Sequence, residues 1–469
     1  MGKKKKNKNE LNDEFDVNYS NSFSNTLPSA KSTKSTDCDD SVLTSMNNLS
    51  LDKCRSSDVE NLTMSPTTRL KYKFNKSPRM KNLSLKFSKT RTDTEKYCIQ
   101  DTIIKINNKL STNWLSEFEY CLNEHIPDDK ECCGLKNMGN TCFMNCILQC
   151  MAHISPILII CFNRQKSNIT GLLFNAFSSL IDNMWSQDDN KPITPYQLKI
   201  EIDRITDTFD GFDQEDCSEF LIYLLQGLHD DIQKSLKFTK PDELFNKLKK
   251  PQNCRRKSAM KCWKNYLDST NHSYLIDIFV GQYKSQLKCL TCSTISNTYD
   301  PFWMISLPIK RRLTNLSLLD CFELFTQTEK LDGPDKAYCS NCKCIKKSTK
   351  NLLIEKFPKV LNIQLKRFTT NGKKIHSHIS IPFTNLNLTP FYAKEDSINI
   401  YYDLIGMCVH TGNLSGGHYY SYCRHPIDKN VWSVFNDSIV SNVNFSCIKS
   451  SMNNAYILFY ELKNFETKI

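Results

Sequence analysis

The sequence predicts an α+β fold, in which helices come first along the chain and strands follow. Apolar residues recur at helical spacing in three early segments, at 143–153, 171–184 and 215–237. Strand patterns, rich in aromatic and β-branched residues, dominate the later part, at 361–365, 418–422, 431–435 and 455–460. Because the two kinds of element are segregated, an α+β class is favoured over an alternating α/β sheet.

The chain has 469 residues, a net charge of +12 and 22 cysteines. A chain of this length can bury a large core without disulfide staples. No apolar run follows Lys3 to Lys6, so no secretory signal is predicted, and the apolar cluster at 154–162 is too short to cross a bilayer. We therefore expect an intracellular protein, cytoplasmic or nuclear, whose cysteines are thiols, metal ligands or a nucleophile.

The N-terminal part of the chain differs in composition from the rest. Residues 1–100 are rich in Ser and Thr and poor in core formers, which is typical of a disordered leader. Within them, residues 61–92 carry nine basic side chains and no acidic one, which indicates either a solvated tail or a docking segment for an acidic partner. Residues 101–132 predict a leader helix, and the polar, basic stretch 240–271 predicts an insertion or mobile loop.

A Gly- and Asn-punctuated loop, residues 134–141, runs into an apolar helical segment that begins at Cys142. The start of a helix has unsatisfied N–H groups and a partial positive charge, and both favour a thiolate. The side-chain amide of Asn137 and the backbone N–H of Cys142 could donate to a developing oxyanion. The segment therefore predicts a cysteine nucleophile, and the alternative is a buried structural cysteine.

A cysteine nucleophile needs a base, and His418 is the strongest candidate among the nine histidines. It follows Gly416 and Gly417 and opens an aromatic strand, where the glycines leave room for a ligand. Asn436 and Asp437, at the end of the next strand, are both candidates to orient its imidazole. Such a set matches the nucleophile, base and orienting residue of papain-like enzymes, whereas the alternative is an ordinary strand histidine.

Two Cys-x-x-Cys knuckles are separated by 46 residues, and their cysteines are Cys289, Cys292, Cys339 and Cys342. Four thiolates in two such pairs suit a closed tetrahedral zinc site of structural type. The alternative is four unligated thiols. Cys344 is a spare thiol that could replace one of the ligands.

Five segments together resemble the ubiquitin-specific proteases. Residues 134–145 are similar to the cysteine box of that family, and residues 416–422, with Trp432 and 435–438, are similar to its histidine box. Residues 214–220 are similar to its Gln-Gln-Asp motif, with Glu215 in place of the second Gln. Further strand matches lie at 365–368 and 455–460. The segments occur in family order between about 133 and 462.

The resemblance implies a papain-like thumb–palm–fingers architecture in a catalytic domain at 133–463, with zinc-ribbon fingers at about 275–350. It implies a thiol protease, a deubiquitinase that cleaves the bond after the C-terminal glycine of ubiquitin through a thioester. By their match to the family motifs, Cys142 is the nucleophile, His418 the base and Asn436 the orienting residue. The remaining implied site residues are Asp437 as alternative orienter, Asn137 in the oxyanion hole, and Asp216 and Glu219 at the ubiquitin tail.

The implied cofactor is one structural Zn²⁺ on the four knuckle cysteines, with no catalytic cofactor. The implied partners are ubiquitin and ubiquitinated proteins. Two other classes of function remain open from the residues. One is a ubiquitin-binding scaffold of weak catalytic activity. The other is a nucleic-acid binder that uses residues 61–92 together with the zinc ribbon.

Overall fold

In the computed structural model, the contacts divide the chain into units at 1–80 and 81–469, and all described residues belong to the second. The described residues are 122, 126, 130–164, 169–186, 191–209, 211, 213–235, 254–310, 316–393, 399–413 and 416–463. The leader at 1–100, with its basic segment 61–92, lies outside them, as does most of the predicted helix at 101–132. Leu122 and Ile126, from that segment, are buried in the core that includes α5.

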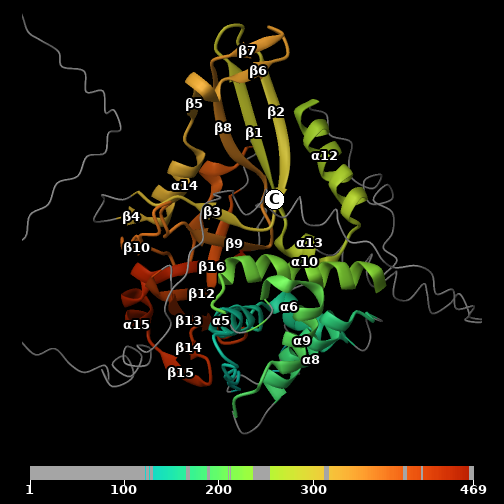
Figure 1. Cartoon of the computed structure of the whole chain (residues 1–469), viewed down its shortest axis with the longest axis vertical. Coiled ribbons are helices and arrows are strands. Elements are labelled where there is room, and N and C mark those ends of the chain that lie inside the picture. The colour runs from blue at the N-terminus through green and yellow to red at the C-terminus, as the bar shows by residue number, and fades with distance from the viewer. Residues whose placement is uncertain are drawn as a thin grey trace, which may run out of the picture. The chain divides into compact units, whose positions relative to one another are not determined.

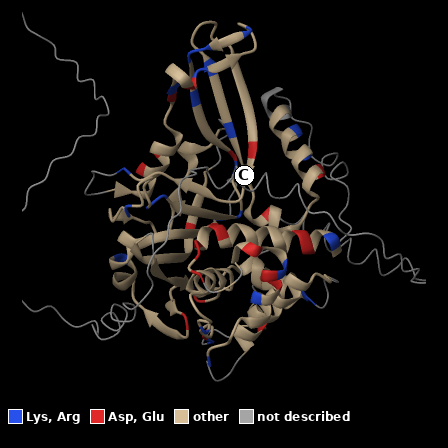
Figure 2. Ribbon diagram, in the orientation of Figure 1, with Lys and Arg blue, Asp and Glu red and all other residues tan. Residues whose placement is uncertain are grey.

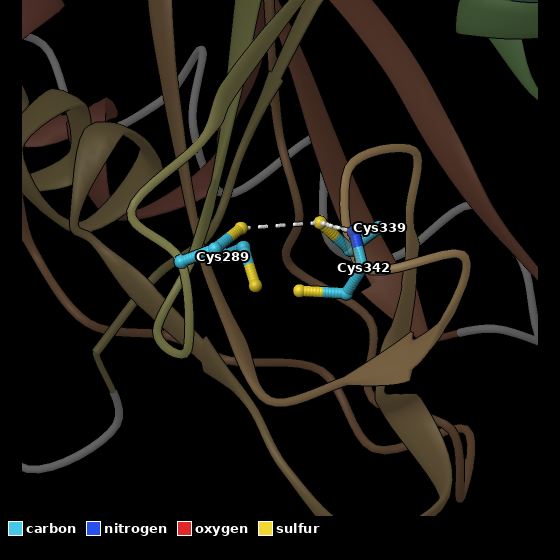
Figure 3. A group of neighbouring side chains, drawn as sticks. Cys289, Cys339 and Cys342 are labelled. Carbon is cyan, nitrogen blue, oxygen red and sulfur yellow. Dashed lines mark hydrogen bonds between the residues drawn. The ribbon is translucent and has the colours of Figure 1, made fainter.

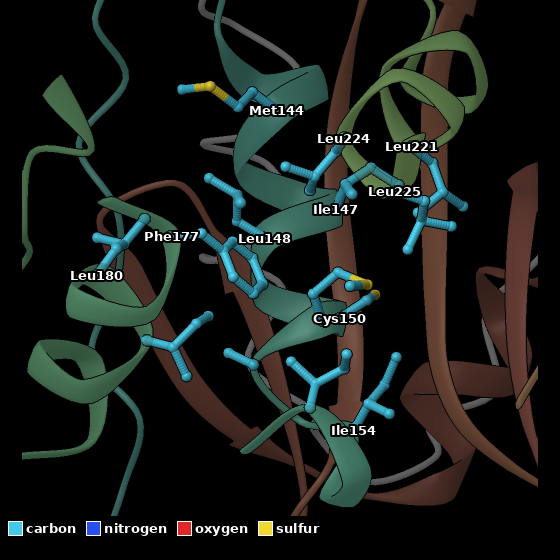
Figure 4. Packing of buried hydrophobic residues seen from close by; sticks show 14 of the residues in the cluster. Met144, Ile147, Leu148, Cys150, Ile154, Phe177, Leu180, Leu221, Leu224 and Leu225 are labelled. Carbon is cyan, nitrogen blue, oxygen red and sulfur yellow. The ribbon is translucent and has the colours of Figure 1, made fainter. Parts of the chain in front are cut away.

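In the described residues of the N-terminal half, five helices form the thumb, and α5 is the central one (Figure 1). Every residue of α5 is buried, including the polar Asn145 and Gln149, so the protein encloses this mainly apolar helix on all sides. Figure 4 shows Leu148 of α5 beside Phe177, and Ile147 beside Leu224. The predicted helices at 143–153, 171–184 and 215–237 are confirmed as α5, α8 and α10. The thumb helices are α5 (Cys142–Met151), α6 (Ser155–Phe162), α8 (Leu172–Ser186), α9 (Tyr196–Ile205) and α10 (Cys217–Ser235).

In the described part of the chain, a sheet of eight strands forms the palm beside these helices. All of its strand pairs are antiparallel except β3 with β9. Side chains alternate between its two faces. Tyr419 and Cys423 of β13 join the thumb core, whereas Tyr420 and Tyr422 join a second core behind the sheet. The strands, in spatial order, are β15 (Ile439–Val443), β14 (Trp432–Asn436), β13 (Gly416–Arg424), β12 (Tyr401–Asn413), β16 (Ala455–Leu462), β9 (Val360–Leu365) and β3 (Ile305–Leu307), and β11 (Leu386–Asn387) pairs with β12. The four predicted strand segments are confirmed as β9, β13, β14 and β16.

A four-stranded sheet forms the fingers, and a two-stranded hairpin lies at its far end (Figure 1). Few side chains of this sheet are buried, and lysines line several of its strands (Figure 2). The fingers therefore lack a thick apolar core of their own. The sheet order is β2 (Ile295–Phe302), β1 (Gly281–Cys289), β8 (Ser348–Lys356) and β5 (Glu329–Leu331), and the hairpin is β6 (Ala337–Cys339) with β7 (Cys344–Lys346).

The stretch 240–271 was expected to be an insertion or a mobile loop, and its described part is instead a helix, α12 (Cys254–Thr270). The Lys356 ammonium lies 4.0 Å from the centroid of the Trp263 ring. Leu267 packs with Ile276 and Val280 in a small separate cluster. The mobile-loop alternative is therefore wrong for residues 254–270, whereas the insertion stays a prediction. The pattern missed the helix because polar residues lie among Trp263, Tyr266 and Leu267, which form one apolar face.

Short elements complete the domain. No single helix among the described residues is long and apolar enough to span a membrane, although α5 and α6 pass such a test as one pair bent by 86°. The remaining elements are α13 (Tyr274–Phe279), α14 (Leu318–Thr326), α15 (Phe445–Ser450), β4 (Leu316–Ser317) and β10 (Ile379–Ser380), and the 3₁₀ turns η1 (Asp207–Phe209), η2 (Gly333–Asp335), η3 (Thr389–Phe391) and η4 (Met452–Asn454).

Candidate active site

The loop before α5 turns sharply, so that Cys142 becomes the first residue of the helix. Gly139 and Asn140 both adopt a left-handed backbone, with φ of 109° and 52°. Glycine takes this conformation freely and asparagine tolerates it. Cys142 is buried, and the geometry of an α-helix provides no internal partner for its N–H. The sulfur therefore lies where the helix dipole and free N–H groups favour negative charge.

Asn137 organises this loop through its side-chain oxygen. The Oδ1 atom accepts from the N–H groups of Gly139 at 3.0 Å and Thr141 at 3.1 Å. Its Nδ2 atom donates to Oδ2 of Asp437 at 2.9 Å. An amide nitrogen carries two hydrogens, so a second N–H remains for the predicted role at an oxyanion.

His418 lies near the start of β13, where the chain has little room. A Cβ added to Gly417 would lie 2.2 Å from the carbonyl oxygen of Thr411, so a side chain cannot fit there. The Nε2 atom of His418 lies 2.5 Å from Oδ1 of Asn436. Because a carbonyl oxygen only accepts, Nε2 carries the proton of this hydrogen bond. The neutral imidazole therefore leaves Nδ1 as its proton acceptor, which a general base requires.

The pKa of His418 reflects its burial and three neighbouring residues. Burial lowers this pKa, but hydrogen bonds to Cys142 and Asn436, and the nearby Cys142 and Asp437, raise it to about 9. The structure therefore brings the three residues predicted for the triad together. A cysteine and a protonated histidine in contact can form a thiolate–imidazolium pair, the reactive state of papain-like enzymes.

Asp437 does not hydrogen-bond the imidazole, unlike the adjacent Asn436. Its carboxylate accepts from Nδ2 of Asn137 at 2.9 Å and from Nδ2 of Asn145 at 2.8 Å. Its backbone oxygen accepts from the N–H of Leu135 at 2.8 Å. The direct orienting contact on His418 thus comes from Asn436, and Asp437 binds the cysteine loop.

Asp216 lies just before α10 with both carboxylate oxygens engaged. Oδ1 accepts from the N–H of Ser218 at 2.7 Å, which caps the helix, and Oδ2 accepts from the Tyr456 hydroxyl at 2.6 Å. Gln364 donates to the Tyr456 oxygen at 2.9 Å and to the Ser218 hydroxyl at 2.8 Å. This network fixes the start of α10 against β9 and β16.

The start of α10 carries further acidic residues. Glu219 is exposed in the first turn of the helix. Burial and the neighbouring carboxylates of Glu219, Asp213 and Asp216 raise the pKa of Glu215. Gln214, beside them, accepts the N–H of Gly417 at 2.8 Å through Oε1. The segment before α10 is therefore linked through Gln214 to the start of β13, the strand that carries His418.

Sequence reasoning assigned no role to Asn145, Gln214, Gln364 or Tyr456. Each makes its contact with a residue far away along the chain, and no spacing rule reports such a pair. Asn145, Gln214 and Tyr456 do fall inside segments 134–145, 214–220 and 455–460, which carry the resemblance. That position was the one signal that could have drawn attention to them.

The sequence profile described as ubiquitin carboxyl-terminal hydrolase matches residues 133–460. The chain belongs to the ubiquitin carboxyl-terminal hydrolase family. The chain is 37% identical to ubiquitin carboxyl-terminal hydrolase 2 of Rattus norvegicus, over 70% of this chain and 54% of that protein. It is also 37% identical to the Gallus gallus protein of the same name, over 70% of this chain and 93% of that protein. The chain thus spans about half the length of the rat relative.

A solved structure supports the same family and fold. It is the SAGA DUB module of Ubp8, Sgf11, Sus1 and Sgf73 bound to monoubiquitin. The likeness has a TM-score of 0.57 and 26% sequence identity, and it covers 71% of this chain and 69% of that chain. The predicted α+β fold and the resemblance to ubiquitin-specific proteases are therefore confirmed.

This member of the ubiquitin carboxyl-terminal hydrolase family also has a cluster of four cysteines at the fingertips (Figure 3). The sulfur atoms all lie within 4.8 Å of one another, as a shared metal ion requires. Ser293 and Lys343, which follow the second cysteine of each knuckle, have matching φ of 56° and 54°. The cluster consists of the predicted ligands Cys289, Cys292, Cys339 and Cys342. Cys344 is exposed and lies outside this group.

The chemistry of the four sulfurs also suits a cation. Hydrogen bonds with the side chains of Thr294 and Asn341 lower the pKa of Cys292 to about 5. The sulfur of Cys292 in turn raises the pKa of Cys342 to about 12. The cluster therefore favours a thiolate at Cys292, and the charge of this thiolate disfavours a second one at Cys342. A bound divalent cation would offset this repulsion between the thiolates.

Proposed function

We propose that this chain is a cysteine-type deubiquitinase that cleaves the isopeptide or peptide bond after the C-terminal glycine of ubiquitin. The observation that carries the proposal is the contact of His418 with both Cys142 and Asn436. A buried cysteine at a helix start, with a histidine base and an orienting amide, is the arrangement of a thiol protease. The family match and the ubiquitin-bound structural neighbour support ubiquitin as the substrate.

The chemistry follows from the donors and acceptors at the site. Cys142 transfers its proton to His418, and the thiolate attacks the carbonyl carbon of the terminal glycine. The second N–H of Asn137 and the N–H of Cys142 donate to the resulting oxyanion. The His418 imidazolium then protonates the departing lysine amine as the C–N bond breaks, which leaves a thioester. Water attacks this thioester with His418 as base, and Cys142 leaves with its proton restored.

The surroundings of the site suit the tail of ubiquitin. A side chain at Gly417 would clash with the carbonyl oxygen of Thr411 and with the ring of His410, so the backbone beside His418 requires glycine. Asp216 and Glu219 lie at the start of α10, where carboxylates favour a basic peptide. We assign them to recognition of the residues that precede the terminal glycines.

We assign the fingertip cysteines to one structural zinc ion. Zinc prefers four thiolates in tetrahedral geometry, and such closed sites stabilise folds rather than catalyse reactions. The ion would join the end of the β1–β2 turn to the β6–β7 hairpin. Because Cys142 lies in the thumb, in another subdomain, we assign no step of the reaction to this metal.

A ubiquitin probe with a C-terminal electrophile tests the proposal. The wild-type chain should form a covalent adduct, and Cys142→Ala should abolish it. Cys146→Ala is the matched control, because Cys146 is a buried thiol one turn further along the same helix. Absence of an adduct on the wild type, or an adduct that survives Cys142→Ala, would refute the assignment.

A further inference from the structure

Asn145 is a buried polar residue one turn after Cys142 on α5, with 2% of its surface exposed. Its Nδ2 atom donates to Oδ1 of Asp437 at 2.8 Å and lies 3.3 Å from the carbonyl oxygen of Lys136. Its Oδ1 atom is buried and has no hydrogen-bond partner among the described residues. An unsatisfied buried acceptor costs stability, which calls for an explanation.

The carboxylate of Asp437 bridges Asn145 and Asn137. Its Oδ1 binds Asn145 and its Oδ2 binds Asn137, so one carboxylate joins the two side chains. The N–H groups of Gly139 and Thr141 hold the other end of the Asn137 amide. An amide group is planar, so fixing its oxygen and one N–H also fixes the direction of the second N–H.

We propose that Asn145 is a positioning residue, which holds Asp437 and thereby aims the oxyanion donor Asn137. This inference rests on the proposed function of Asn137 in that reaction. The buried helix α5 carries both Cys142 and Asn145, so it locates the nucleophile and the oxyanion donor from one rigid element. Preorganised donors act strongly because they need no rearrangement as charge develops. The unsatisfied Oδ1 is then the cost of presenting Nδ2 to Asp437.

The test is the hydrolysis of a fluorogenic C-terminal amide of ubiquitin by Asn145→Ala. We expect kcat to fall about ten- to a hundredfold, as for lost partners of active-site ligands, with KM unchanged. Gln149→Ala is the matched control. Gln149 lies one turn further along α5, is 1% exposed and donates to the carbonyl oxygen of Cys133 at 2.9 Å. It should lose stability but keep kcat.

A double-mutant cycle with Asn137→Ala separates positioning from a structural role. If Asn145 acts through Asn137, the double variant should be hardly slower than Asn137→Ala alone. Losses in kcat that multiply, or a rise in KM alone, would overturn the inference. Should Asn145→Ala fail to fold, Asn145→Ser, which keeps a small polar group, takes its place in the same cycle. A wild type without activity would instead overturn the proposed function, and this inference with it.

Discussion

The domain contains two groups of clustered cysteines, whose surroundings shift the thiol pKa in opposite directions at Cys408 and at Cys292. Between thumb and palm, the core thiols are buried, and Sγ of Cys150 lies 3.6 Å from Sγ of Cys408. Burial raises the pKa of Cys408 to about 12 and raises that of Cys150 well above its ordinary value. At the tip of the fingers, hydrogen bonds lower the pKa of Cys292 to about 5. The core thiols are Cys146, Cys150, Cys217, Cys408 and Cys423, and the fingertip thiols are Cys289, Cys292, Cys339 and Cys342.

This difference teaches that environment, rather than residue type, decides what a cysteine does. A protonated, buried thiol behaves as a small apolar side chain that fills space. A thiolate held by hydrogen bonds at a surface is a metal ligand. It also indicates what stabilises each region. The thumb and palm bury a large apolar cluster, whereas the finger sheet buries few side chains, so under the proposed zinc assignment it would depend on its metal.

Removal of the metal should give the largest difference in stability between the two regions. Structural zinc contributes roughly 10 kcal/mol or more to the folding of small zinc domains. We expect Cys292→Ser, or a strong chelator, to abolish the protection from hydrogen exchange of the amides in β1 and β8. The amides of α5 should stay protected, because apolar burial holds them. Finger amides that remain protected without metal would contradict this dependence.

The reverse experiment sharpens the same contrast. Leu148 on α5 is fully buried, and its truncation to Ala should lower the free energy of unfolding by about 2–5 kcal/mol. The content of one zinc ion per chain should not change, because no fingertip thiol belongs to the thumb cluster. Loss of zinc from Leu148→Ala would show that the two regions unfold as one unit.

Sequence patterns predicted the elements whose contacts are local or repeat with a period. The helix that begins at Cys142, the strand at His418 and both cysteine knuckles belong to this class. The helix α12 did not follow from pattern, because Trp263 and Leu267 pack on the fingers from a stretch rich in lysine. Residues 1–100 predict a disordered leader and 133–463 a catalytic domain, and these boundaries stay predictions.

The partners within the site could not be predicted from spacing. Asn436 and Asp437 are adjacent and chemically similar, so the sequence left both as candidates to orient His418. Their division between His418 and Asn137 depends on the turn after β14, where Asp437 has a φ of 50°. Such a turn rotates neighbouring side chains away from each other, which only the folded backbone reveals.

The pH dependence of stability should give a smaller effect. It concerns His418 and its partner Cys142, a cysteine that belongs to neither the core thiols nor the fingertip thiols. The folded pKa of His418 is about 9, above the unfolded value of about 6.5. Its contribution to stability is therefore fully present below about pH 6.5 and is lost as the pH rises through 9. We expect Tm to fall by about 2–4 °C per kcal/mol lost over that range, measured by calorimetry.

The groups that face His418 supply the control for this titration. Cys142 faces it from α5, Asn436 from β14, Asp437 from the turn after β14, and His410 from β12. Cys142→Ala removes a hydrogen bond and a charge, so the pKa of His418 in an NMR titration should fall. Cys146→Ala should leave it near 9. An unchanged pKa in Cys142→Ala would separate the cysteine from the histidine and refute their pairing.

Cys344 should give the smallest effect, and it tests where the fingertip group ends. Its thiol is exposed and donates to the carbonyl oxygen of Cys342 at 3.2 Å, outside the four clustered sulfurs. Cys344→Ser should change the free energy of unfolding by less than about 0.5 kcal/mol, as exposed substitutions usually do. Zinc affinity should be unchanged, whereas Cys342→Ser should lose the ion. If both variants lose zinc alike, Cys344 is a ligand, and the assignment of the four clustered sulfurs as the complete ligand set is wrong.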